Sequence, residues 1–287
     1  MNSQGLLYLV LAVAFSSGVA LTLKAAEQRE IPRAPLLALN YLICTLIVLT
    51  WGGWRAAGGN TLEVWGLGLL IGLMYVVSLW LFQRAIAAEG LALSTTLMRL
   101  SAALPTLGSL LIFNEHAGLP QIAGITLAFL SLPLASRQPL RPGQLKGDSL
   151  QGLGWGLALF AVYGFTDFMF KVQAELIPGA DPQGFMTGIF VTAFLLTLPG
   201  LLRGGMPNRQ TIFWGAVLGS TNMLATFFWI KMLAAVPGSV AYPSLGLGVI
   251  AVSTAAGLVF WQEKLRPANV VFLGLACLAV VLIHGGW

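Results

Sequence analysis

The stretch that most constrains the fold runs from Gly238 to Phe260 and contains no charged residue. Trp261 closes it, and an abrupt polar cluster follows at residues 262–266. At about 1.5 Å per residue, a helix of this length crosses the roughly 30 Å hydrocarbon core of a bilayer. A tryptophan at the interface and charged residues beyond it are typical of such a helix end. The sequence therefore predicts a membrane-spanning helix here.

Comparable apolar runs recur along the whole chain. Hydrophobic residues make up 57% of the sequence and charged residues 9%, whereas about one quarter of the residues in soluble domains are charged. We expect an all-α integral membrane protein with ten transmembrane helices. The predicted spans are 5–23, 35–54, 63–83, 91–113, 118–136, 151–170, 183–202, 210–230, 238–260 and 268–285. The net charge of +5 lies in short loops, so it bears on membrane orientation and does not indicate nucleic-acid binding.

The two halves of the chain match each other at an offset of about 147 residues. Matching pairs are Gly5 and Gly152, Lys24 and Lys171, Pro35 and Pro182, Gly68 and Gly215, and Gly72 and Gly219. Because each half holds five predicted helices, an odd number, the second half enters the membrane from the opposite side. We expect two inverted five-helix repeats, 1–136 and 151–287, joined by a linker loop at 137–150. Such repeats are typical of secondary transporters with alternating access and a binding site near mid-membrane.

Two ionisable side chains lie inside predicted spans, where charges are costly and often functional. Arg99 is either a bidentate clamp for a substrate carboxylate or phosphate, or a long side chain that reaches back to the interface. Asp167 either holds a coupling proton or a substrate amine, or forms an ordinary i, i+4 pair with Lys171. We expect no direct contact between Arg99 and Asp167, because their helical positions place them near opposite membrane faces.

Two pairs of charged repeat mates stand at the ends of predicted helices. Lys24 and Lys171 either face one another and attract an anion, or reach to the interface separately. Glu115 and Glu263 end the fourth and ninth predicted helices. We interpret all four residues as candidate gating or structural contacts.

The rest of the predicted binding pocket combines aromatic walls with a few polar groups. Its candidate lining residues are Tyr75, Tyr163, Trp229, Tyr242, Asn40, Ser94 and Asn222. A buried amide inside a span needs a hydrogen-bond partner. Asn40 and Asn222 therefore either bind substrate or join neighbouring helices, and the sequence leaves both interpretations open.

One segment of the chain carries a family resemblance. Its residues are Ala241, Tyr242, the run Ser244–Ile250, Phe260, Glu263 and Leu265. They resemble the last part of small multidrug resistance transporters and the helix 9 to 10 region of EamA-like ten-helix transporters in the drug/metabolite transporter superfamily. The resemblance extends over residues 231–283 and implies a transport protein. Glu115 and Glu263 resemble the family's recurrent helix-end glutamate.

The membrane orientation stays open between two readings. Loops that follow the odd-numbered predicted helices hold most of the Lys and Arg residues. The positive-inside rule places those loops in the cytoplasm and both termini outside. The resemblance implies instead that both termini lie inside.

We expect a secondary active transporter in the inner (plasma) membrane that exports a small polar or zwitterionic organic metabolite, such as an amino acid. A proton is the candidate coupling ion, and the minimal unit is a monomer or a homodimer. One alternative is a multidrug or organic cation exporter, although the first predicted helix lacks the membrane-embedded glutamate of small multidrug resistance transporters. The other alternative is a transporter of lipid-linked or amphipathic cargo.

A membrane-embedded enzyme is the alternative from another class. His116 and His284 are isolated, Cys44 and Cys277 fall inside predicted spans, and no HExxH or GxxxxGK[ST] sequence occurs. Carboxylates are few and scattered, so no catalytic constellation stands out. We expect no enzymatic activity, no metal site and no cofactor.

Overall fold

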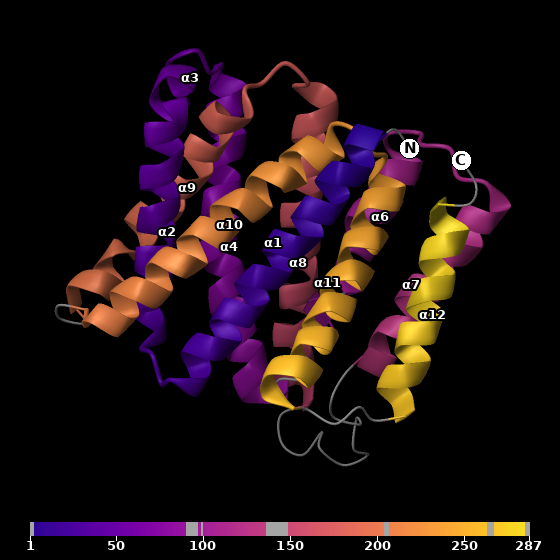
Figure 1. The fold of residues 1–287 in the computed structure, drawn as a ribbon. Helices are drawn as coiled ribbons and strands as arrows, with labels where there is room; N and C mark the ends of the chain where they lie inside the picture. The colour runs from indigo at the N-terminus through magenta and orange to yellow at the C-terminus, as the bar shows by residue number, and fades with distance from the viewer. Residues whose placement is uncertain are drawn as a thin grey trace. The chain divides into compact units, whose positions relative to one another are not determined.

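The computed structural model describes residues 3–89, 97–98, 100–135, 149–203, 207–262 and 267–284, which form helices and no strands (Figure 1). Seven of the described helices are long and apolar enough to cross a membrane. With the shorter apolar helices Leu119–Ser131 and Val270–Ile283, they make the chain a multi-pass membrane protein. The elements are α1 (Ser3–Gln28), α2 (Arg33–Val48), η1 (Leu49–Gly53), α3 (Trp54–Gly58), α4 (Leu62–Glu89), α6 (Ala103–Leu111), α7 (Leu119–Ala135), α8 (Ser149–Leu176), α9 (Pro182–Arg203), α10 (Arg209–Leu233), α11 (Gly238–Trp261) and α12 (Pro267–His284).

The predicted spans agree with the observed helices along most of the described chain. The exception is the run 91–113, of which α6 covers only Ala103–Leu111. Residues 91–96 and Arg99 of that run lie outside the described residues. The total of ten transmembrane helices therefore stays a prediction.

The second predicted span bends near its end. After α2, the π-helical turn η1 leads into the short helix α3. Gly52 in this turn has a φ of 103°, which only glycine adopts at little cost. A Cβ on the next residue, Gly53, would lie 2.5 Å from Thr187 Oγ1 of α9. The two glycines let the bent segment pack closely on α9.

The helices gather into two compact units, each built from two separate parts of the chain. Unit 1 comprises mainly residues 77–171 and 236–287, and unit 2 comprises residues 2–76 and 172–235. Each unit therefore takes segments from both predicted halves. The two units are described separately below.

In unit 2, α10 packs against α1 and α2, and α2 also packs against α9. The buried side chains of Ala26, Ile31, Leu36 and Leu218 form one apolar cluster. Phe228 of α10 stacks on Phe15 of α1 with ring centroids 5.5 Å apart. Apolar and aromatic contacts thus hold α10 at the centre of this unit.

In unit 1, α7 lies along α12 and α6 packs on α11 (Figure 1). The C-terminal part of α4 packs on α8 through a cluster of Leu81, Ala85 and Leu159. Trp80 of α4 meets Trp155 of α8 edge to face, with ring centroids 5.5 Å apart, a favourable aromatic geometry. These contacts anchor α8, the helix that carries Asp167 and Lys171.

Close contact between α4 and α9 in unit 2 depends on glycine. A Cβ added to Gly72 of α4 would lie 2.5 Å from the carbonyl oxygen of Ile189 in α9. A Cβ added to Gly66 of the same helix would meet nothing within 4 Å. Membrane helices approach closely where such small residues meet.

We expect Gly72→Ala to lower the free energy of unfolding by about 1–3 kcal/mol, because the new methyl group forces α4 and α9 apart. Gly66→Ala is the matched control. It should leave the melting temperature unchanged or raise it, since alanine favours a helix over glycine by about 1 kcal/mol. Thermal unfolding in detergent measures both variants. Equal melting temperatures for the Gly72→Ala and Gly66→Ala variants would contradict the close approach of α4 to α9 at Gly72.

Candidate functional site

The candidate site in unit 1 begins with the loop between α6 and α7. The backbone N–H of Glu115 donates to the Ser109 carbonyl at 3.1 Å, which folds the loop back onto the end of α6. Asn114 has a φ of 52°, a left-handed conformation that Asn tolerates better than most residues. This local geometry presents the side chain of Glu115 to the start of α11.

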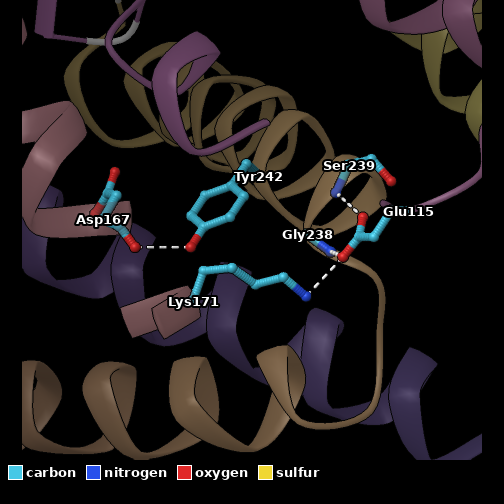
Figure 2. A network of polar contacts seen from close by, with 6 residues as sticks. All are labelled: Glu115, Asp167, Lys171, Gly238, Ser239 and Tyr242. Atoms are coloured by element: carbon cyan, nitrogen blue, oxygen red, sulfur yellow. Dashed lines mark hydrogen bonds and ion pairs between the residues drawn. The ribbon is translucent and has the colours of Figure 1, made fainter. Parts of the chain in front are cut away.

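The Glu115 carboxylate caps the N-terminus of α11 (Figure 2). Its Oε1 accepts a hydrogen bond from the N–H of Gly238 at 2.7 Å, and its Oε2 accepts one from Ser239 at 2.8 Å. Pro237, the residue at the N-cap position, provides no side-chain cap. The first N–H groups of a helix need acceptors, and the positive end of its dipole favours an anion. A glutamate distant in sequence thus supplies the missing cap.

The same carboxylate pairs with Lys171 of α8. Lys171 Nζ lies 2.6 Å from Glu115 Oε1, and the two side chains are 2% and 12% exposed. The ammonium also lies 5.7 Å from the ring centroid of Phe113, within the range of cation–π attraction. A buried charge is tolerated only when it is paired and hydrogen-bonded. Glu115, Lys171 and the first turn of α11 therefore form one polar network.

The network determines the protonation of Glu115, which lies in the loop outside the membrane-spanning helices. Burial by itself raises the pKa of this carboxyl group. Hydrogen bonds from Lys171, Ser239 and Gly238 outweigh burial, so the pKa lies below its ordinary value of 4.5. Glu115 is therefore ionised at neutral pH.

A second contact joins α8 to α11 beside this network. Tyr242 Oη donates a hydrogen bond to the carbonyl oxygen of Asp167 at 2.7 Å (Figure 2). Tyr242 is 2% exposed and lies one turn after the start of α11. Glu115 thus bridges Lys171 of α8 to Gly238 of α11, and the hydrogen bond from Tyr242 to Asp167 joins the same two helices. On each helix the two attachment points lie one turn apart.

Ser109 of α6 completes the surroundings of the α11 N-terminus. Its side chain is 0% exposed and its Oγ has no hydrogen-bond partner in the described structure. A Cβ added to Gly238 would collide with Ser109 Oγ and would lie 3.2 Å from Cε of Lys171. The hydroxyl therefore lies beside the first residue of α11, and a side chain at position 238 would displace it.

An apolar groove of about 590 Å³ lies between α6 and α8 in unit 1. Its lining residues are Leu104, Leu107, Gly108, Leu111, Ile112, Ala161, Val162, Gly164, Phe165 and Phe168. The ring centroid of Phe168 lies 5.9 Å from that of Phe113, the ring beside the Lys171 ammonium. The groove and the polar network are therefore neighbours, which gives this part of unit 1 an amphipathic character.

Unit 2 contains a separate buried polar contact. Asn222 Nδ2 of α10 donates to Asn40 Oδ1 of α2 at 3.2 Å, and Asn40 is 1% exposed. Cys44 Sγ donates to the Gly219 carbonyl at 3.2 Å. The structure thus gives Asn40 and Asn222 the helix-to-helix hydrogen bond that the sequence left as one of two interpretations.

The remaining predicted site residues are distributed as follows. Tyr163 of α8 packs on the Leu81, Ala85 and Leu159 cluster of unit 1. Trp229 of α10 is buried in unit 2. Lys24 of α1 and Tyr75 of α4 belong to the same unit. Arg99, Ser94 and Glu263 lie outside the described residues. Within the described part of the chain, no group of three or more His, Cys, Asp or Glu side chains is placed to hold a metal ion.

Sequence reasoning missed the partners of Glu115. The dipeptide Pro237-Gly238 marks a helix start without a capping side chain, and that signal calls for an acceptor from elsewhere in the chain. No pattern in the sequence indicated that Glu115, 123 residues away from Gly238, provides it. The groove between α6 and α8 also had no sequence signal, because its residues resemble any lipid-facing surface.

We expect Glu115→Gln to lower the free energy of unfolding by about 3 kcal/mol, because the buried ammonium of Lys171 loses its ion pair with the carboxylate. Combining it with Lys171→Met should cost less than the sum of the single changes by about 1 kcal/mol or more. The exposed pair of Glu27 and Arg33, at 2.8 Å, is the matched control and should show a coupling below about 1 kcal/mol. Chemical or thermal unfolding in detergent measures the free energies of unfolding of the single and double variants, from which the coupling energy of each pair follows. Similar coupling energies for both pairs would contradict the buried network.

Stability should also fall in acid through Glu115. Its pKa is lower in the folded than in the unfolded state, so its contribution is complete above about pH 4.5 and disappears as the pH falls further, toward the folded pKa. We expect the melting temperature of the wild type to drop more steeply than that of Glu115→Gln between about pH 5 and 3. Parallel curves would show that this carboxylate contributes nothing to the acid response.

Comparisons with known proteins agree with this architecture. Residues 3–137 match the sequence model of the EamA-like transporter family. A protein of uncharacterized function from Haemophilus influenzae is 25% identical over 276 residues, which cover 91% of each chain. A probable 4-amino-4-deoxy-L-arabinose-phosphoundecaprenol flippase subunit, ArnE, from Klebsiella pneumoniae is 28% identical over 81 residues, 28% of this chain and 71% of ArnE.

The fold also has a solved counterpart. A protein of known crystal structure superposes with a TM-score of 0.78 at 16% identity, over 99% of this chain and 97% of that chain. At this identity the likeness concerns the fold alone. The match over residues 3–137 confirms the expected resemblance: this part of the chain is similar to the EamA-like transporter family, consistent with the drug/metabolite transporter superfamily. The residues that suggested the resemblance lie in the other half of the chain, at 231–283.

Proposed function

We propose that the protein is a secondary active transporter of the inner (plasma) membrane that exports a small polar or zwitterionic organic metabolite by alternating access. The observation that carries this proposal is the pairing of helices inside each unit. In the predicted repeat, α2 corresponds to α9, α6 to α11 and α7 to α12. Each of these pairs packs together within its unit.

Such pairing supports two inverted repeats at 1–136 and 151–287. Equivalent helices close to a two-fold axis pack on each other, as these pairs do. A molecule made of inverted equivalents has two arrangements of similar energy, each open to one side of the membrane. Exchange between them is the basis of alternating access.

The solute-binding roles rest on the side chains that stand out in the spans. Arg99 would hold the solute carboxylate, and Asp167 would hold the coupling proton. Tyr163 and Tyr242 would contact the remainder of the solute together with Ser94. Glu115, Glu263, Lys24 and Lys171 would control opening at the helix ends.

A specific observation favours amphipathic or lipid-linked cargo as the second candidate. The groove between α6 and α8 is apolar and partly open, with Leu107 51% and Leu111 76% exposed. It adjoins the charged network of Glu115 and Lys171, so it offers an apolar wall and a polar end. The partial similarity to a flippase subunit points in the same direction. A multidrug or organic cation exporter gains less support, since the groove lies beside a lysine.

Transport into proteoliposomes tests the proposal. We expect labelled amino acids to accumulate under a pH gradient, and Asp167→Asn to abolish this accumulation while counterflow exchange remains, because exchange needs no net proton movement. Arg99→Ala should reduce both by about tenfold or more, the effect of losing a charge-assisted hydrogen bond of about 1.5–3 kcal/mol.

The matched control is Glu63→Gln, which removes an exposed carboxylate from the first turn of α4. It should change neither accumulation under the pH gradient nor counterflow exchange. Transport of quaternary amines regardless of Arg99 would replace the zwitterion assignment by the cation exporter. Transfer of lipid-linked phosphates without amino acid transport would favour the second candidate.

A further inference from the structure

The position that the Glu115 carboxylate occupies has the properties of an anion-binding site. We propose that it binds the carboxylate or phosphate group of the transported solute, and that Glu115 fills it when no solute is bound. This inference rests on the proposed transport function and adds a second anion contact to Arg99. Solute binding would then displace Glu115 from the N-terminus of α11.

More hydrogen-bond donors surround this position than Glu115 engages. The N–H groups of Gly238 and Ser239 and the ammonium of Lys171 contact its two oxygens. Ser109 Oγ, fully buried and without a partner, points to the same helix start. The Glu115 carboxylate leaves the Ser109 hydroxyl unpaired, whereas a phosphate has additional oxygens that can engage this hydroxyl together with the donors that Glu115 uses. The orphan hydroxyl is the feature that a purely structural cap leaves unexplained, since unsatisfied buried polar groups are costly.

Glu115 is placed so that it can leave. It stands in the loop between α6 and α7 and not in a helix, and its side chain is 12% exposed, against 2% for Lys171. Lys171, in contrast, belongs to the long helix α8. Departure of Glu115 breaks a buried ion pair and removes the acceptor of two helix N–H groups, a cost that an entering anion offsets. Exchange of the two anions therefore couples occupancy to the contact between this loop and α11.

The groove between α6 and α8 suits the apolar part of the same ligand. Phe168 lines the groove and lies beside Phe113, which in turn contacts Lys171. An anion held at Lys171 can therefore extend an apolar portion over these rings. The anionic group belongs either to a water-soluble solute or to a lipid-linked phosphate, and the donors recognise both.

Anion rescue of a Glu115 variant tests the site. Glu115→Ala is purified in a neutral detergent, and its melting temperature is followed against acetate, inorganic phosphate and a polyprenyl phosphate in mixed micelles, with chloride at equal ionic strength. At about ten times the dissociation constant, a specific anion should raise the melting temperature by about 3 °C. At the same anion concentrations the melting temperature of the wild type should shift at least tenfold less, because its Glu115 carboxylate competes with the added anion for the site.

Matched variants decide whether the rescue comes from this site. Adding Ser109→Ala to Glu115→Ala should weaken the phosphate response, and adding Lys171→Met should abolish it. Glu63→Ala, which removes an exposed carboxylate, should show no anion response. If Glu115→Ala does not fold, Glu115→Gln replaces it, since a neutral amide competes less well than a carboxylate and should still respond more strongly than the wild type.

Each outcome bears on the proposal. Rescue by acetate and phosphate supports the site with a water-soluble ligand, and rescue by the polyprenyl phosphate alone supports the site with a lipid-linked one. Equal responses to all salts, or a response that survives Lys171→Met, would overturn it. The measurement needs no transport, so rescue without amino acid transport would leave the site standing and refute only the proposed function.

Discussion

The charge on Lys171 is the constraint around which unit 1 is organised. An ammonium that is 2% exposed cannot remain without a counterion, because the cost of removing it from water is several kcal/mol. Glu115 meets that need, and the same carboxylate satisfies two N–H groups at the start of α11. One anion therefore joins the loop after α6 to both α8 and α11.

Unit 2 is held together by different means. In a bilayer, apolar side chains gain little by leaving lipid for another helix, so close packing and hydrogen bonds between helices matter more. Gly72 lets α4 approach the Ile189 backbone of α9, and the amides of Asn40 and Asn222 join α2 to α10. These contacts hold the helices of unit 2 together permanently. The ionic network of unit 1 is also strong, but the anion that it contains can be exchanged under the proposed mechanism. We infer that solute binding acts on unit 1.

Part of the candidate site was accessible from sequence and part was not. Glu115, Asp167 and Lys171 stood out because charged residues in or next to apolar runs are rare. Their partners did not stand out, since Lys171 and Gly238 lie far from Glu115 in the chain and helical periodicity relates only neighbouring turns. Ser109 attracted no attention, because a serine in a span is common and only its lack of a partner makes it notable.

The sequence by itself determined that this chain crosses a membrane repeatedly, where most of its helices lie, and that its C-terminal segment resembles a transporter family. Those properties depend on the length and polarity of continuous runs, which each segment carries alone. Only the tertiary structure decided that the helices gather into units drawn from both halves, that Glu115 caps α11 and neutralises Lys171, and that an apolar groove adjoins them. These features arise where distant segments meet, and a local pattern of residues does not encode which segments will meet.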